Sequence, residues 1–129
     1  MRKHVSAAAA AALMAGCSTS STWRPVDTAR EAVWMGVTLI DYGQTLNIAS
    51  HPERWEEKNP ILGKHPSRSQ VNAYFAASAL FHPAVSAVLP TDACVGPICD
   101  WRAAWQWMTI SVEAGVVGHN YSLGVKTDF

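Results

Sequence analysis

Charge is scarce in this sequence. Only 16% of its 129 residues are Asp, Glu, Lys or Arg, well below the roughly 25% of an average soluble domain, whereas 49% are hydrophobic. The small number of basic residues excludes the footprint of a nucleic-acid-binding protein, and the hydrophobic content excludes a disordered chain. A chain of this length forms one domain at most. We therefore expect a small folded protein for which water is not the only solvent.

The common catalytic motifs are absent as well. The sequence has no Gly-x-Ser-x-Gly elbow, no phosphate-binding loop, no His-Glu-x-x-His zinc motif and no dinucleotide fingerprint. The sequence therefore does not indicate any of the common enzyme classes, and a rare class of enzyme stays open. We expect no cofactor and no bound metal.

The N-terminus carries the features of an export signal. Arg2 and Lys3 precede an apolar run that ends near residue 14, too short for the roughly 20 residues of a spanning helix. The residues Leu13-Met14-Ala15-Gly16-Cys17 then resemble the lipobox of bacterial lipoproteins, with Met14 in the place that Leu usually takes. This resemblance implies cleavage after residue 16 and lipidation of Cys17. Its acyl chains, palmitate among them, would hold the protein on a bilayer.

Cleavage would leave a mature chain of 113 residues with eight Lys and Arg against ten Asp and Glu, a net charge of −2. We expect a signal peptide over 1–16, a lipidated Ser- and Thr-rich tether over 17–26, and one helical domain over 27–129. The protein would lie in the bacterial cell envelope, anchored to a membrane and facing the periplasm. Ser18 replaces the aspartate typical of inner-membrane retention, which favours the outer membrane and leaves the choice open.

Hydrophobic periodicity predicts an all-α domain of about three helices, over 28–49, 71–89 and 101–118. The segment 71–89 is apolar on nearly every side, as in a helix buried in protein or in lipid. A loop of nineteen residues, 51–69, separates the first two helices, and a connector this long is usually functional or disordered. Residues 120–129 alternate apolar and polar side chains, so we expect an extended C-terminal tail.

Two cysteines flank a turn. Cys94 and Cys99 enclose Val-Gly-Pro-Ile, a sequence that brings two thiols together, and an export compartment would oxidise them. No histidine lies close in sequence to complete a metal site. We predict a disulfide bond, which stabilises so small a loop by about 2 kcal/mol.

Three motifs of the mature chain carry a further resemblance. They are Asp41-x-x-Gln44-Thr45, Glu57-x-Asn59-Pro60-Ile61-Leu62-Gly63-x-His65-Pro66-Ser67 and Val112-Glu113-Ala114-Gly115-x-x-Gly118-His119-Asn120. Together they resemble a group of small uncharacterised lipoproteins from proteobacteria and their phages, which implies kinship and compartment but no activity. An Asp-bearing helix followed by a Glu-x-Asn-Pro loop is also similar to small multi-helix membrane proteins, which favours embedded helices.

Few residues could build an acid–base or metal site: Asp41, Glu57, His65, Glu113 and His119. Their spacing has no ligand signature, and Glu113 and His119 stand six apart, so they do not share a helix face as i, i+4 partners do. A buried carboxylate must find a partner or neutralise. We therefore expect Asp41 and Glu113 to lock the helices together by pairing with Arg102, His119, Asn47 or backbone amides.

Two functions stay open. The first is a lipid-anchored envelope protein with a structural or partner-binding role, whose partners are the membrane and an envelope protein. The second is a small membrane-associated hydrolase or metal-dependent enzyme using Asp41, Glu57, Glu113 and His119. We expect His82, on the most apolar helix, to be a hydrogen-bonded core residue rather than a ligand.

The placement of the helices relative to the bilayer is open too. If all three cross it, the loop with Arg54, Lys58, Lys64 and Arg68 is cytoplasmic and the cysteine turn is external, as the positive-inside rule and disulfide chemistry prefer. Against this, a charge such as Asp41 near a helix centre costs about 2.5–3.5 kcal/mol on insertion. The sequence slightly favours a compact, membrane-tethered domain that turns its polar faces to water.

Overall fold

The computed structural model describes residues 22–129. The expected signal peptide, Cys17 and most of the tether lie outside this range. The described chain is all-α, as predicted from the periodicity, and consists of three helices: α2 (Pro25–Ser50), α3 (Arg68–Val88) and α4 (Trp101–Ser122).

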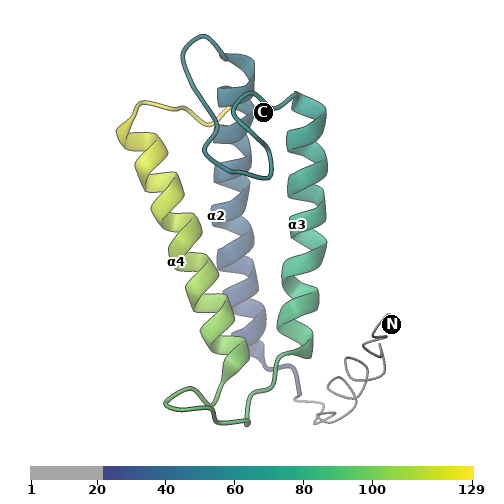
Figure 1. The fold of residues 1–129 in the computed structure, drawn as a ribbon. Coiled ribbons are helices and arrows are strands. Elements are labelled where there is room, and N and C mark those ends of the chain that lie inside the picture. The colour runs from purple at the N-terminus through teal and green to yellow at the C-terminus, as the bar shows by residue number, and fades with distance from the viewer. Residues whose placement is uncertain (1–21) are drawn as a thin grey trace, which may run out of the picture.

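The three helices stand side by side, with α2 behind and between α3 and α4 (Figure 1). α2 packs against both neighbours, whereas α3 and α4 meet only sparingly. Loop 51–67 and the C-terminal segment lie at one end of the bundle, which we call the loop end. The turn 89–100 and the start of α2 lie at the other, which we call the cysteine end.

The starts of α2 and α3 follow known capping chemistry. Pro25 occupies the first turn of α2, where its missing N–H is not needed, and Asp27 accepts a hydrogen bond from the Arg24 N–H at 2.9 Å. α3 opens with a capping box: the Ser67 hydroxyl accepts from the Gln70 N–H at 3.2 Å, and the Gln70 side chain accepts from the Ser67 N–H at 2.8 Å.

The C-terminal segment is more helical than the alternation suggested. α4 ends at Ser122. Gly124, just after the C-cap residue Leu123, has a φ of +85°, the left-handed conformation in which glycine commonly terminates a helix. Residues 125–129 have no regular secondary structure and run along α2, where the Asp128 N–H donates to the Gly43 carbonyl at 3.1 Å. A Cβ at Gly43 would meet the side chain of Thr127, so the bare backbone there lets the tail approach.

The cysteine end is closed by the predicted pair. The sulfurs of Cys94 and Cys99 lie 2.01 Å apart, at disulfide-bond distance. Between them Gly96 adopts a φ of +59°, which only glycine adopts without strain, and Val95 and Ile98 pair across the turn.

The interior of the bundle is unusual in being half polar. A small apolar core of Leu46, Val71 and Phe75 lies toward the loop end. Among the described residues, the buried polar side chains are as numerous as the buried hydrophobic ones, and they are Asp27, Thr38, Gln44, Thr45, His82, Ser86, Arg102 and Gln106. Polar and charged residues of this kind are rarely buried in a water-soluble protein unless they are paired.

Candidate functional site

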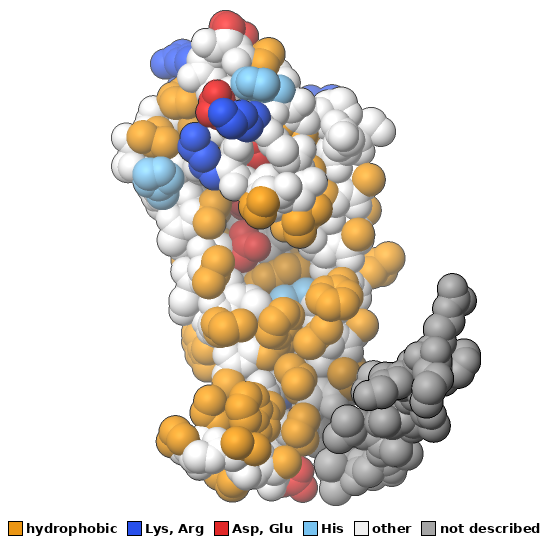
Figure 2. Space-filling model, in the orientation of Figure 1, with side chains coloured by type: hydrophobic (Ala, Val, Ile, Leu, Met, Phe, Trp, Pro, Cys, Tyr) orange, Lys and Arg blue, Asp and Glu red, His pale blue; other side chains and the backbone are white. Residues whose placement is uncertain are grey.

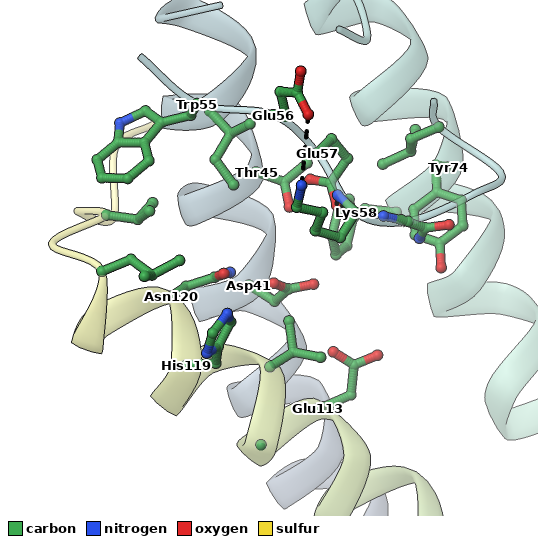
Figure 3. A pocket seen from close by; sticks show the side chains of 18 of the residues that line it. Asp41, Thr45, Trp55, Glu56, Glu57, Lys58, Tyr74, Glu113, His119 and Asn120 are labelled. Atoms are coloured by element: carbon green, nitrogen blue, oxygen red, sulfur yellow. Dashed lines mark hydrogen bonds and ion pairs between the residues drawn. The ribbon is translucent and has the colours of Figure 1, made fainter. Parts of the chain in front are cut away.

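A cavity of about 620 Å³ opens at the loop end between α2, α4 and loop 51–67. Four of the five candidate residues line it, and they come from three different segments: Asp41, Glu57, Glu113 and His119. His65 is not part of the lining. Figure 3 shows Asp41 with Glu57 on one side and Glu113 on the other. The tertiary structure thus gathers three carboxyl groups and one imidazole around one space.

Glu57 is positioned by the turns of loop 51–67. Its Oε1 accepts hydrogen bonds from the N–H groups of Lys58 and Asn59, both at 2.8 Å, and its own N–H donates to the Lys64 carbonyl at 2.9 Å. Asn59 in turn accepts from the Ile61 N–H at 2.9 Å through its side chain. The Glu-x-Asn-Pro motif therefore builds a folded loop that holds one carboxylate over the bundle.

Asp41 and Glu113 lack the partners expected from the sequence. Neither side chain forms a hydrogen bond or ion pair with another described residue, and the buried Oδ1 of Asp41 is without a hydrogen-bond partner. The prediction that they pair with Arg102, His119, Asn47 or backbone amides is wrong, and Arg102 instead binds Asp27 near the cysteine end at 3.0 Å. The Oε2 of Glu57 is likewise buried and unpartnered. Two carboxylate oxygens from separate segments thus remain uncompensated at one cavity.

The basic side chains near the cavity are engaged elsewhere. Lys58 Nζ lies 3.5 Å from Glu56 Oε2, and Lys64 Nζ lies 3.7 Å from the same atom. Figure 3 marks the first of these pairs with a dashed line. Glu56 thus pairs with both lysines, and within residues 22–129 no lysine or arginine forms an ion pair with the inner carboxyl groups.

The remaining wall of the cavity is mostly apolar. It is formed by aliphatic and aromatic side chains from all three helices, the loop and the C-terminal segment: Ile48, Trp55, Leu62, Tyr74, Phe75, Val112, Val116, Leu123 and Val125. Polar ties join α2 to α4 here, since the Gln44 amide donates to the Val117 carbonyl at 3.3 Å and accepts from Asn120 at 3.1 Å.

A second polar cluster lies nearer the cysteine end, and sequence reasoning did not assemble it. Asp27 accepts from Arg24, Arg30 and Arg102, and Arg102 also donates through Nε to the Ser86 carbonyl at 2.7 Å. A signal for it is present in the sequence, because each helix carries its polar residues four apart: Asp27 and Glu31, His82 and Ser86, Arg102 and Gln106. That spacing places each pair on one helix face.

His82 is a hydrogen-bonded core residue, as predicted. Its Nδ1 lies 2.8 Å from Glu31 Oε2 and its Nε2 lies 2.8 Å from Thr109 Oγ1, and its ring stacks on Trp34 with centroids 3.8 Å apart. The row of carboxylate, imidazole and hydroxyl resembles a catalytic arrangement. However, His82 is only 3% exposed, and the Thr109 hydroxyl donates to carbonyls of its own helix. We interpret the cluster as structural.

Metal binding has no support in the described residues. Over 22–129 no three His, Cys, Asp or Glu side chains are grouped as a metal site requires.

No protein-family model, curated protein or solved structure matches the chain. The resemblance to small lipoproteins therefore stays a prediction, and function must be inferred from geometry.

Proposed function

We propose that this protein is a lipid-anchored component of the bacterial cell envelope that acts by binding, and that its cavity takes a small organic cation with an apolar body. The observation that carries the ligand class is the pair of buried, unpartnered carboxylate oxygens, Asp41 Oδ1 and Glu57 Oε2, on a mostly apolar wall. The anchor is the lipidated Cys17 expected from the lipobox.

The charge of the site supports a cationic ligand. Burying a carboxylate without a partner costs several kcal/mol, and the nearby lysines pair with Glu56 instead. An ammonium group between Asp41, Glu57 and Glu113 would offset that cost. Opposite charges about 4 Å apart attract by roughly 4 kcal/mol at the effective dielectric constant of a protein surface.

The shape of the site supports an apolar body. The volume of about 620 Å³ lies within the roughly 300–1,000 Å³ that is usual for small-molecule pockets. Trp55 and Tyr74 are among the lining residues, and aromatic rings attract both hydrocarbon and organic cations.

The alternative of a hydrolase has weaker support. Asp41, Glu57, Glu113 and His119 do share the cavity, as such an enzyme would need. Nucleophilic catalysis also needs a nucleophile within hydrogen-bond reach of its base. No two of these four side chains are hydrogen-bonded to each other, so binding is the function we propose.

Titration calorimetry on the purified full-length protein tests the proposal with benzylammonium as the probe. We expect benzylammonium to bind and its neutral analogue, benzyl alcohol, to bind at least tenfold more weakly. Asp41→Asn should weaken benzylammonium binding at least tenfold. Asp92→Asn is the matched control, because it removes an exposed carboxylate outside the cavity, and it should change nothing. Equal binding of the two probes, or unchanged binding to Asp41→Asn, would refute the ligand class.

A further inference from the structure

The outward faces of the three helices carry no charge along most of their length. On α3, every exposed residue from Ala73 to Val88 is alanine, valine, leucine or phenylalanine, and Leu80 is 77% exposed. The exposed residues of α2 between 29 and 40 are Ala29, Ala32, Val33, Gly36, Leu39 and Ile40. Those of α4 between 107 and 118 are Trp107, Met108, Ser111, Val112, Ala114, Gly115, Val116 and Gly118.

Glu113 lines the cavity, and the other polar groups on these stretches are turned inward or satisfied locally. The Ser111 hydroxyl donates to the Trp107 carbonyl of its own helix at 2.8 Å. Arg30 is 16% exposed in its side chain, pairs with Asp27 and lies over the Trp107 ring. Asp27 and Arg102 are fully buried. A bundle with charges inside and hydrocarbon outside is the reverse of a water-soluble protein, and ionisable residues of membrane helices face the bundle interior in this way.

The dimensions of the bundle suit a bilayer. With 26, 21 and 22 residues, the helices are about 39, 32 and 33 Å long, against a hydrocarbon thickness of roughly 30 Å. Aromatic side chains mark both ends, with Trp23 and Trp101 at the cysteine end and Trp55 and Tyr121 at the loop end. Tryptophan and tyrosine concentrate at the two membrane–water interfaces.

We propose that α2, α3 and α4 cross a bilayer as one bundle, with lipid hydrocarbon covering their outward faces. By length and composition α3 is the one described helix that could cross a membrane. Composition averages over a whole helix, however, and the buried polar residues Asp27, Arg102 and Gln106 lie where α2 and α4 meet. The surface that lipid would touch is therefore more apolar than the mean hydropathy of either helix indicates.

The charges also assign an orientation. The loop end carries the solvent-exposed basic side chains: Arg54, Lys58, Lys64, Arg68 and Lys126. Figure 2 shows Lys and Arg side chains gathered at that end, whereas hydrophobic side chains predominate over the rest of the face, with acidic side chains near its middle and at the cysteine end. At the cysteine end, Arg24 and Arg102 are held in ion pairs with Asp27. The positive-inside rule places the loop end in the cytoplasm, and an oxidised Cys94–Cys99 pair belongs on the opposite side.

Three variants of the full-length chain, each with one added cysteine, test this arrangement: Asp92→Cys, Leu80→Cys and Lys64→Cys. All three positions are exposed, so a tethered periplasmic domain would expose all three thiols to water. Native Cys94 and Cys99 are blocked as a disulfide when no reductant is added, and the unsubstituted chain supplies the background.

Labelling uses a membrane-impermeant maleimide on cells whose outer membrane has been permeabilised. We expect Asp92→Cys to react at once, Lys64→Cys to react only after the inner membrane is lysed, and Leu80→Cys to react only after unfolding in detergent, because thiols do not ionise in hydrocarbon. Immediate labelling of all three would overturn the proposal, and so would labelling of Lys64→Cys before Asp92→Cys. Neither result depends on the ligand of the cavity.

Discussion

Breaking the buried ion pair between Arg102 and Asp27 should strongly destabilise the bundle. Arg102 is 0% exposed, lies 3.0 Å from Asp27 and donates to the Ser86 carbonyl at 2.7 Å. Removing one partner of a buried pair costs about 3–5 kcal/mol because the other charge stays in the interior. In Arg102→Met, Asp27 still keeps Arg24 and Arg30, so we expect the lower figure, about 3 kcal/mol.

Asp27→Asn should cost more than Arg102→Met, because it leaves Arg102 buried without its anion. The matched control is Arg24→Met. Arg24 bonds the same carboxylate at 2.8 Å, but its side chain is 39% exposed, so water screens the pair and we expect a much smaller loss of stability.

Thermal unfolding of the purified variants, followed by circular dichroism, measures these differences. For a domain of this size 1 kcal/mol corresponds to a change in Tm of about 4–8 °C. Arg102→Met should therefore lower Tm by at least about 12 °C, and Arg24→Met should lower Tm by much less. If the two substitutions lowered Tm equally, burial would not be the source of the stability and the reasoning would be refuted.

Two further predictions concern the cysteines. Cys17→Ser should abolish incorporation of a clickable fatty acid, because the lipobox directs acylation to that thiol; equal label in the variant and the unsubstituted chain would contradict it. Cys94 and Cys99 should resist alkylation until reductant is added, and replacing both by serine should cost about 2 kcal/mol or less of stability, because the disulfide closes only a small loop. Mass spectrometry and thermal unfolding measure the two effects, and free alkylation without reductant would exclude the bond.

Much of the fold follows from short stretches of sequence. The apolar periodicity predicted three helices, and residues 22–129 form three. The helix α4 runs four residues past its expected end at residue 118. The difference lies at residues 119–122. There the alternation of apolar and polar side chains favours an extended chain, but α4 continues instead, and Gly124 follows its C-terminal cap. The sequence pointed to Glu57-x-Asn59 as a motif, but it did not indicate that these side chains fold loop 51–67 over the bundle.

The candidate site was predicted only as a set of residues. Asp41, Glu57, Glu113 and His119 were selected because they bring charge to segments poor in it, and the structure places all four on one cavity. Their partners were predicted wrongly. Arg102 was expected beside Asp41 or Glu113, yet it lies beside Asp27, about half the length of α2 away from Asp41.

The sequence by itself determined what depends on neighbours along the chain: the helices, the Ser67 cap and the cysteine turn. These features form because residues within a few positions of one another satisfy the same backbone groups. The tertiary structure decided which charges meet, since Asp27 and Arg102 are 75 residues apart and only the packing of α2 on α4 joins them. It also decided which faces turn outward, because composition counts polar residues in a helix without recording the side on which they lie.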